Sequence, residues 1–239
     1  LLFPSETESC FPFLTEKGHV ISLVGGGGKT TLMYAMASCC ARKDWKVLAT
    51  TTTHIMKPPG GVWADNNAAR DALWADGSYA VAGSAAPEGK LTVPPAQLLT
   101  RWMELADLTL IEADGAKRMP CKAPAVHEPV ILPQCDTVLA VAGLSALGRP
   151  LEKVCFRAEL AAGLLGAPLD AALTPELLAK LLADEQGGRK AVGARHFYAV
   201  LNQADMPARR AAGEQTKKLL KRDYNVEAVL TAFSKEERA

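Results

Sequence analysis

The residues whose types and spacing most directly suggest chemistry follow an apolar run at 21–24. In chain order they are Gly25, Gly26, Gly27, Gly28, Lys29, Thr30 and Thr31. Because glycine has no Cβ, backbone N–H groups in such a loop can approach phosphate oxygens closely. A lysine then supplies positive charge for the β- and γ-phosphates, and a threonine hydroxyl is a ligand for Mg²⁺. The stretch predicts a cradle for the phosphates of a nucleotide bound with Mg²⁺.

The spacing of this cradle departs from the commonest phosphate-binding pattern. G-x-x-x-x-G-K-[ST] requires a glycine at position 23, where this chain has Leu23. The shorter form G-x-x-G-K-T-T resembles the loops of Mur-type ligases and of the metallochaperone and partitioning branch of P-loop NTPases. The alternative is a glycine-rich turn without a ligand, but a turn does not require Lys-Thr-Thr at its end.

Two acidic residues follow a second apolar run, at 108–112. P-loop NTPases place the acid that holds magnesium at this position, so Glu112 is the predicted magnesium residue and Asp114 the second candidate. Asp114 is also a candidate to orient an attacking water. The alternative is that both acids begin a solvated loop. Lys117 and Arg118 either stabilise phosphate charge in the transition state or are ordinary loop cations.

A threonine run ends in a histidine at positions 50–54. One interpretation is a switch segment beside the phosphates, in which Thr52 or Thr53 coordinates magnesium and His54 binds a metal, a substrate or the attacking water. The alternative is structural, because threonine favours strands and a lone histidine is more often a satisfied structural group than a ligand.

The run Asn202-Gln203-Ala204-Asp205 matches the N-[KQ]-x-D pattern that recognises guanine in GTPases. A carboxylate at Asp205 would accept hydrogen bonds from the guanine N1–H and 2-amino groups, and adenine has no amino group there. Such a site discriminates strongly against the wrong base. The alternative is a plain turn between a strand and a helix with Asp205 as the helix cap. GTP is therefore favoured over ATP, and Asn202 and Asp205 are the candidate base-binding residues.

Short apolar stretches alternate with helical patterns along the chain. This alternation predicts an α/β fold with a mostly parallel sheet and flanking helices, of the P-loop NTPase type. In such a sheet, ligands bind at the carboxyl ends of the strands. The clusters described above each follow a predicted strand, so we expect them to converge on one edge. The predicted strands cover 19–24, 45–50, 79–82, 108–112, 137–142, 196–201 and 226–231, and the predicted helices cover 30–42, 66–74, 94–106, 157–165, 175–182 and 207–222.

The whole chain of 239 residues is long enough for one α/β domain. We expect a single domain over 1–239, with an N-terminal extension at 1–18 and a proline-rich loop at 119–136 over the site. A net charge of +1 gives no electrostatic case for nucleic acid. The six cysteines form no C-x-x-C pair, and Cys121 is the one cysteine that the sequence places near the loops above. With no apolar run long enough to span a bilayer, we expect a cytoplasmic protein without a membrane partner.

Four segments together resemble the YqeC family, named as putative selenium-dependent hydroxylase accessory proteins. They are SLVGGGGKTTLMYAMA, LATTTTHI, LIEADGAKRMPCKAPAVHEPVI and VAGLSALGRPL, and with NQAD the likeness extends over about residues 18–232. The resemblance implies a P-loop protein that acts in the maturation of selenium-dependent molybdenum hydroxylases. The implied partners are such a hydroxylase or a cofactor-synthesis enzyme, and a homodimer is a further expectation.

The leading hypothesis is therefore a Mg²⁺-dependent nucleoside triphosphatase that takes GTP or ATP. Lys29 and the glycine amides hold the phosphates, Thr30 and Glu112 hold magnesium, and Asp114 or His54 orients water. One alternative is an ATP-dependent kinase or ligase that acts on a small substrate, as the Mur-like loop suggests. A second is a nucleotide-binding scaffold without turnover.

Overall fold

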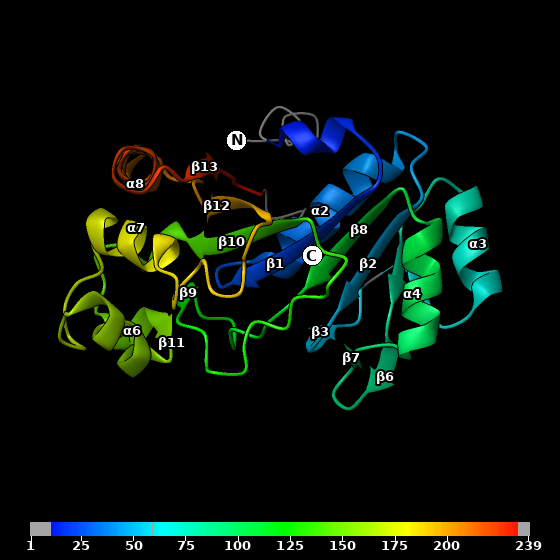
Figure 1. Cartoon of the computed structure of the whole chain (residues 1–239), viewed down its shortest axis with the longest axis horizontal. Coiled ribbons are helices and arrows are strands. Elements are labelled where there is room, and N and C mark those ends of the chain that lie inside the picture. The colour runs from blue at the N-terminus through cyan, green and yellow to red at the C-terminus, as the bar shows by residue number, and fades with distance from the viewer. Residues whose placement is uncertain (1–10, 59, 234–239) are drawn as a thin grey trace.

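The fold is built on one eight-stranded sheet in which every neighbouring pair of strands is parallel, in the order β13-β12-β10-β1-β8-β2-β5-β4 (Figure 1). The structure is a computed structural model that describes residues 11–58 and 60–233. The predicted α/β class with a mostly parallel sheet is confirmed. The strands are β1 (His19–Gly25), β2 (Val47–Thr51), β4 (Trp63–Ala64), β5 (Ala80–Ala82), β8 (Leu108–Glu112), β10 (Thr137–Gly143), β12 (His196–Asn202) and β13 (Glu227–Leu230).

Helices cover both faces of this sheet, as a parallel sheet requires. They are α2 (Lys29–Ala41), α3 (Asn67–Ala75), α4 (Ala96–Leu105), α5 (Leu151–Val154), α6 (Ala158–Leu165), α7 (Pro175–Ala183) and α8 (Pro207–Tyr224). The longer ones agree with the predicted ranges to within one or two residues. Two begin at a side-chain cap, because Asn66 and Thr174 accept hydrogen bonds from the first turns of α3 and α7.

Residues that alternate along the strands build a core on each face. On one face, Ile21 and Leu23 of β1 pack with α2 and with Phe11 and Leu14. On the other face, Val24 joins a cluster that includes α6, α7 and α8. Of the predicted N-terminal extension, residues 1–10 lie outside the described residues, and a short 3₁₀ helix, η1 (Pro12–Thr15), follows them.

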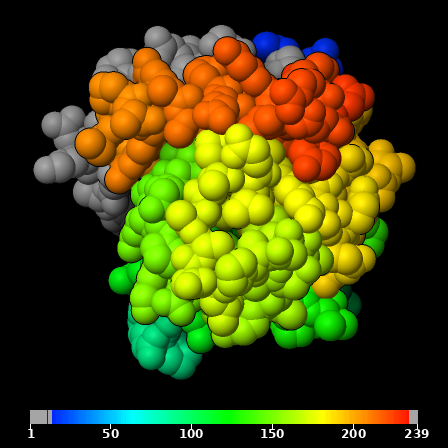
Figure 2. Space-filling model, turned by 90° about the vertical axis from the view of Figure 1, so that its left-hand side faces the viewer, coloured from blue at the N-terminus to red at the C-terminus, as the bar shows by residue number. Residues whose placement is uncertain are grey.

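Helices α6, α7 and α8 form one end of the molecule, where the space-filling view shows α8 lying across the top of the other two (Figure 2). Helix α8 corresponds to the helix predicted over 207–222, and it buries only Gly213, Thr216 and Leu220. Among the described residues, no helix combines the length and the apolar character needed to cross a bilayer.

Two small sheets were not predicted. A three-stranded antiparallel sheet joins β3 (His54–Met56), β7 (Lys90–Thr92) and β6 (Ser84–Ala86). A two-stranded parallel ladder joins β9 (Cys121–Lys122) and β11 (Cys155–Phe156). Strands of two or three residues carry too little periodicity to stand out in a sequence. Both small sheets lie beside the carboxyl edge of the main sheet, and β3 and β7 contribute residues to the cavity there.

Candidate nucleotide site

The glycine run forms a tight loop between β1 and α2 that other side chains would not allow. Gly25, Gly27 and Gly28 have φ values of 92°, 79° and 107°, in the left-handed region. A Cβ on Gly27 would lie 2.1 Å from the backbone nitrogen of Gly143, and one on Gly25 would lie 2.3 Å from the carbonyl oxygen of Val141. The glycines are therefore needed for both backbone conformation and close packing.

The N–H groups that remain available to a phosphate are at the start of α2. Gly26 and Gly27 donate their N–H groups to the carbonyls of Val141 (2.9 Å) and Met119 (3.0 Å). The first helical bond runs from the N–H of Leu32 to the carbonyl of Gly28 (3.0 Å), so the N–H groups of residues 28–31 precede it. Gly26 and Gly27 shape the loop, and the positive end of the helix dipole faces the site.

Lys29 extends from the first turn of α2 into a buried cluster of oxygens. Its Nζ donates to the carbonyl oxygen of Gly25 (2.6 Å) and lies 3.1 Å from Asp114 Oδ1 and 3.8 Å from Glu112 Oε1. The side chain is only 4% exposed. A buried ammonium requires compensating negative charge, and here two carboxylates provide it. A phosphate group would compete for the same ammonium.

Thr30 and Glu112 form the pair predicted to hold magnesium. The Thr30 hydroxyl donates to Glu112 Oε2 at 2.6 Å. Burial raises the pKa of Glu112, against the opposing effects of Lys29 and the Thr30 hydrogen bond. A cation at this carboxylate would favour its charged form. One carboxylate beside one hydroxyl fits Mg²⁺, which binds few protein oxygens and keeps water or phosphate oxygens as its other ligands.

Asp114 lies behind the cradle and does not line the cavity over it. Its Oδ2 accepts from the N–H of Gly25 (3.1 Å) and pairs with the Lys122 Nζ (2.9 Å). Lys122 also pairs with Glu128 (2.8 Å), which pairs in turn with Arg157 (2.6 Å). In this position Asp114 orients Lys29 and the loop rather than a water in the cavity.

The threonine run has structural partners in this structure. The Thr52 hydroxyl donates to the carbonyl of Val130 (2.9 Å), and the Thr51 hydroxyl donates to the carbonyl of Glu112 (3.0 Å). Neither side chain lines the cavity, and Thr52 is turned toward the proline-rich loop instead of the Thr30–Glu112 pair. His54, at the start of β3, does line the cavity.

Residues 202–205 are divided between the cradle and the surface. Asn202 donates from Nδ2 to the Gly27 carbonyl (2.8 Å), and its Oδ1 accepts from the Thr231 hydroxyl (3.0 Å). Gln203 lines the cavity, and its Oε1 is buried with no hydrogen-bond partner among the described residues. Asp205 pairs with Arg209 at 3.0 Å and lies outside the cavity lining.

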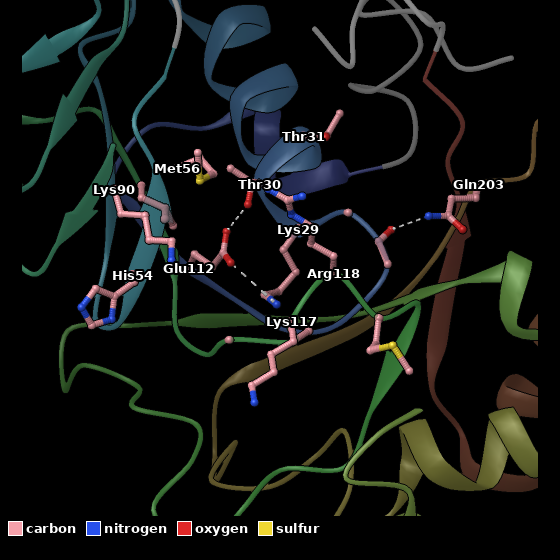
Figure 3. A pocket seen from close by; sticks show the side chains of 16 residues that line it. Lys29, Thr30, Thr31, His54, Met56, Lys90, Glu112, Lys117, Arg118 and Gln203 are labelled. Atoms are coloured by element: carbon pink, nitrogen blue, oxygen red, sulfur yellow. Dashed lines mark hydrogen bonds and ion pairs between the residues drawn. The ribbon is translucent and has the colours of Figure 1, made fainter. Parts of the chain in front are cut away.

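A cavity of about 670 Å³ opens over the cradle, within the usual size range of ligand pockets (Figure 3). The cradle, the end of β8, the turn at 115–119 and the β3–β7 pair form its walls. The lining residues are Gly27, Gly28, Lys29, Thr30, Thr31, His54, Ile55, Met56, Lys90, Glu112, Gly115, Ala116, Lys117, Arg118, Met119 and Gln203.

Several residues at this edge were missed or misjudged from the sequence. Lys90 was missed, although Pro87-Glu88-Gly89 before it is a turn signal between two short stretches. The statement that Cys121 is the one cysteine near these loops is wrong, because it faces Cys155 across the β9–β11 ladder. Both thiols are buried, and the hydrogen bond with Cys155 and burial raise the pKa of Cys121.

The proline-rich segment at 119–136 only begins at the cavity, which Met119 lines. Its later residues follow the back of the cradle, where Val130 donates its N–H to the carbonyl of Ala113 (3.0 Å). His127 is exposed, whereas Glu128 is buried and braces the segment through Lys122 and Arg157.

Comparisons with known proteins agree with the family resemblance. The model of the family described as YqeC protein matches residues 21–159. A relative from Escherichia coli (strain K12), "Uncharacterized protein YqeC", is 35% identical over 182 residues, which are 72% of this chain and 71% of the relative. A solved structure, hydrogenase maturation factor HypB from Archaeoglobus fulgidus, aligns over 96% of this chain and 87% of its own with 13% identity and a TM-score of 0.43. With most of its length matched by the family model and the relative, this chain belongs to the YqeC family.

Proposed function

We propose that this protein binds a Mg²⁺-nucleoside triphosphate at the 25–31 loop and hydrolyses it. The observation that carries the proposal is the buried Lys29 ammonium beside the Thr30–Glu112 pair, at the start of a helix whose first N–H groups face a cavity. Together, these groups and the cavity can accommodate the phosphates of a nucleoside triphosphate and a cation.

In the proposed mechanism the Lys29 ammonium exchanges its contact with the Gly25 carbonyl for phosphate oxygens, while Asp114 continues to orient it from behind. Thr30 and Glu112 would hold the magnesium ion, which would supply positive charge against the negative charge that develops on the phosphates. Lys117 and Arg118 line the same cavity and stabilise negative charge on the transferred phosphoryl group. His54 orients the attacking water.

We also propose that GTP is favoured over ATP. Gln203 lies at one end of the cavity, so the 202–205 segment adjoins the space that a nucleobase would occupy. For Asp205 to contact the base, its carboxylate must exchange Arg209 for the guanine edge. Their pair, with side chains about one-third exposed, is of the weak surface kind that allows such an exchange.

The cellular role we propose follows from the family resemblance. It is an accessory role in the maturation of selenium-dependent molybdenum hydroxylases, with a hydroxylase or a cofactor-synthesis enzyme as partner. Nucleotide hydrolysis would then control delivery or assembly of the cofactor, and a homodimer is the expected assembly.

Calorimetric titration with GTP and ATP, each with Mg²⁺, tests this function. Wild-type protein should bind GTP more tightly, Lys29→Ala should lose both nucleotides, and Asp205→Ala should lose the preference. Lys218→Ala, an exposed change on α8, is the matched control and should behave as wild type. Full binding by Lys29→Ala would contradict the site, and equal binding of ATP and GTP by wild type would contradict the base preference. Tight binding without turnover would indicate a scaffold.

A further inference from the structure

We infer that the end of the cavity formed by His54 and Lys90 is a binding site for a second ligand, a small doubly charged oxyanion, next to the terminal phosphate. This inference rests on the proposed nucleotide site. It adds a ligand that hydrolysis of the nucleotide alone does not need.

The cradle lies in the middle of the residues that line the cavity. Gln203 and His54 lie at opposite ends, with Lys29, Thr30 and Glu112 between them (Figure 3). A nucleotide whose phosphates lie on Lys29 and whose base lies toward Gln203 occupies only one half. The half on the far side of Glu112 is open to another molecule.

Strands β3 and β7 form the wall of that second half. His54 and Met56 are two residues apart on β3 and therefore point to the same side of the strand, and both line the cavity. Lys90 is the cross-strand neighbour of Met56. Between them, Ile55 is buried in the main core and fixes the strand. An imidazole and an ammonium on a fixed wall, beside a thioether, suit a small anion with a short apolar part.

Lys90 is available to such an anion. Its present partner is Glu88, whose side chain is 76% exposed and lies outside the cavity lining. An ion pair of this kind contributes little, because water screens it. An oxyanion inside the cavity would displace Glu88 from the Lys90 ammonium at little cost in free energy.

The facing wall is a turn that carries two further cations. The Met119 N–H donates to the Ala116 carbonyl (2.9 Å), and the two residues between them, Lys117 and Arg118, have φ values of 46° and 62°. Glycine, asparagine and aspartate are the usual residues at such positions, so two long cationic residues there are strained. Strained residues of this kind concentrate at functional sites. The Met119 carbonyl binds the Gly27 N–H, which ties the turn to the cradle.

The side chains that line the cavity carry a net positive charge. Among the described lining residues, four cationic side chains accompany one carboxylate, Glu112. Lys29 belongs to the cradle, and Lys117 packs its ammonium over the Phe156 ring at 5.3 Å. Neither Lys117 nor Arg118 makes an ion pair within the described part of the chain. Lys90 is the lining cation that the proposed nucleotide mechanism does not use, and a second anion would pair with it at the end of the cavity away from Gln203.

Binding to nucleotide-loaded protein tests this site. Wild-type protein is first saturated with Mg²⁺ and a non-hydrolysable GTP analogue, and is then titrated by calorimetry with inorganic phosphate or with malonate. At least one anion should bind; phosphate alone would indicate a phosphoryl-type ligand and malonate alone a dicarboxylate. The change Lys90→Met should weaken anion binding by about tenfold or more while the analogue still binds within about twofold of wild type.

The matched control is Lys218→Met, which removes one positive charge from the exposed face of α8 and should leave anion binding unchanged. Absence of both phosphate and malonate binding by analogue-loaded wild type would overturn the second site and leave the proposed function intact. Equal weakening by Lys218→Met and Lys90→Met would also overturn it, because the effect would then be one of net charge. Failure of the analogue itself to bind would instead overturn the proposed function.

Discussion

At the scale of single residues, the cradle depends on glycines that differ in what they require. Gly77 has a φ of 68° with open space around the missing Cβ, whereas Gly27 has a φ of 79° and backbone atoms of Gly143 within 2.5 Å of that position. Position 77 requires only a left-handed backbone conformation. Position 27 also requires the absence of a Cβ, because the backbone atoms of Gly143 cannot move aside as a flexible side chain can.

This difference predicts unequal costs for the same substitution. Gly77→Ala should lower the free energy of unfolding by about 1 kcal/mol, the cost of a left-handed alanine. Gly27→Ala should lower it by about 3 kcal/mol or more and abolish nucleotide binding, because β1 and β10 must separate to admit the methyl group. Urea unfolding of both variants measures the two costs. Similar values would show that the close approach of Gly27 to Gly143 is not a constraint.

At the scale of elements, the site is assembled by the carboxyl ends of three strands, of which β1 and β8 are neighbours while β10 separates β1 from β12. β1 leads into the cradle, β8 ends in Glu112, and β12 ends in Asn202. Strands far apart in the chain become neighbours in the sheet, so their ends meet. Asn202, at the end of β12, also contacts the ends of two other strands, since it binds the loop after β1 and the hydroxyl of Thr231 after β13.

The hydrogen bonds of Asn202 predict that this residue fixes the position of the loop after β1. Asn202→Ala leaves the Gly27 carbonyl and the Thr231 hydroxyl without this partner, which should cost about 1–3 kcal/mol of stability. Nucleotide affinity should also fall, because the cradle is no longer held to β12. Thr231→Val removes only one of the two bonds and keeps the loop contact, so its effect on nucleotide affinity should be small. Equal loss of affinity in both variants would contradict a direct role of Asn202 in holding the loop.

At the scale of the whole molecule, a buried chain of charges connects the cradle to the helical end. It runs from Lys29 through Asp114, Lys122 and Glu128 to Arg157, which precedes α6. Lys122 is fully buried, and each charge in the chain has an opposite neighbour. The chain therefore couples the phosphate site to the folding of residues 119–157.

This buried chain of charges predicts that the free energy of unfolding decreases at acidic pH. Burial alone would raise the pKa of Glu128, but its hydrogen bonds with Lys122 and Arg157 outweigh that effect and lower the pKa from about 4.5 to about 2. Because the folded pKa is the lower one, the stabilisation is fully present above about pH 4.5 and is lost as the pH falls toward 2. Glu128→Gln should cost about 2 kcal/mol at pH 7, and this cost should shrink with falling pH.

Urea unfolding of wild type and Glu128→Gln at pH 7, 4 and 3 measures that dependence. Glu104→Gln, an exposed change on α4, should stay within about 0.5 kcal/mol of wild type at every pH. A difference between wild type and Glu128→Gln that is the same at all three values would mean that the Glu128 charge does not stabilise the fold.

The sequence by itself determined the α/β class, the strands that end in the cradle, Glu112 and Asn202, and the family. Each of these follows from local information: apolar runs of strand length, glycines before Lys-Thr-Thr, and motifs that stay together in the chain. The Thr30–Glu112 pair was predicted for the same reason, because parallel strands bring their carboxyl ends to one edge.

Only the tertiary structure decided which of the candidate side chains face the cavity. Asp114 and Glu112 are two residues apart, yet Glu112 lines the cavity and Asp114 lies behind the loop with Lys122. The same applies to Thr52, whose hydroxyl is bound by the Val130 carbonyl, and to Lys90, which reaches the site through a three-residue strand. Direction within a loop and pairing of very short strands depend on contacts with distant segments, and a sequence pattern does not contain those contacts.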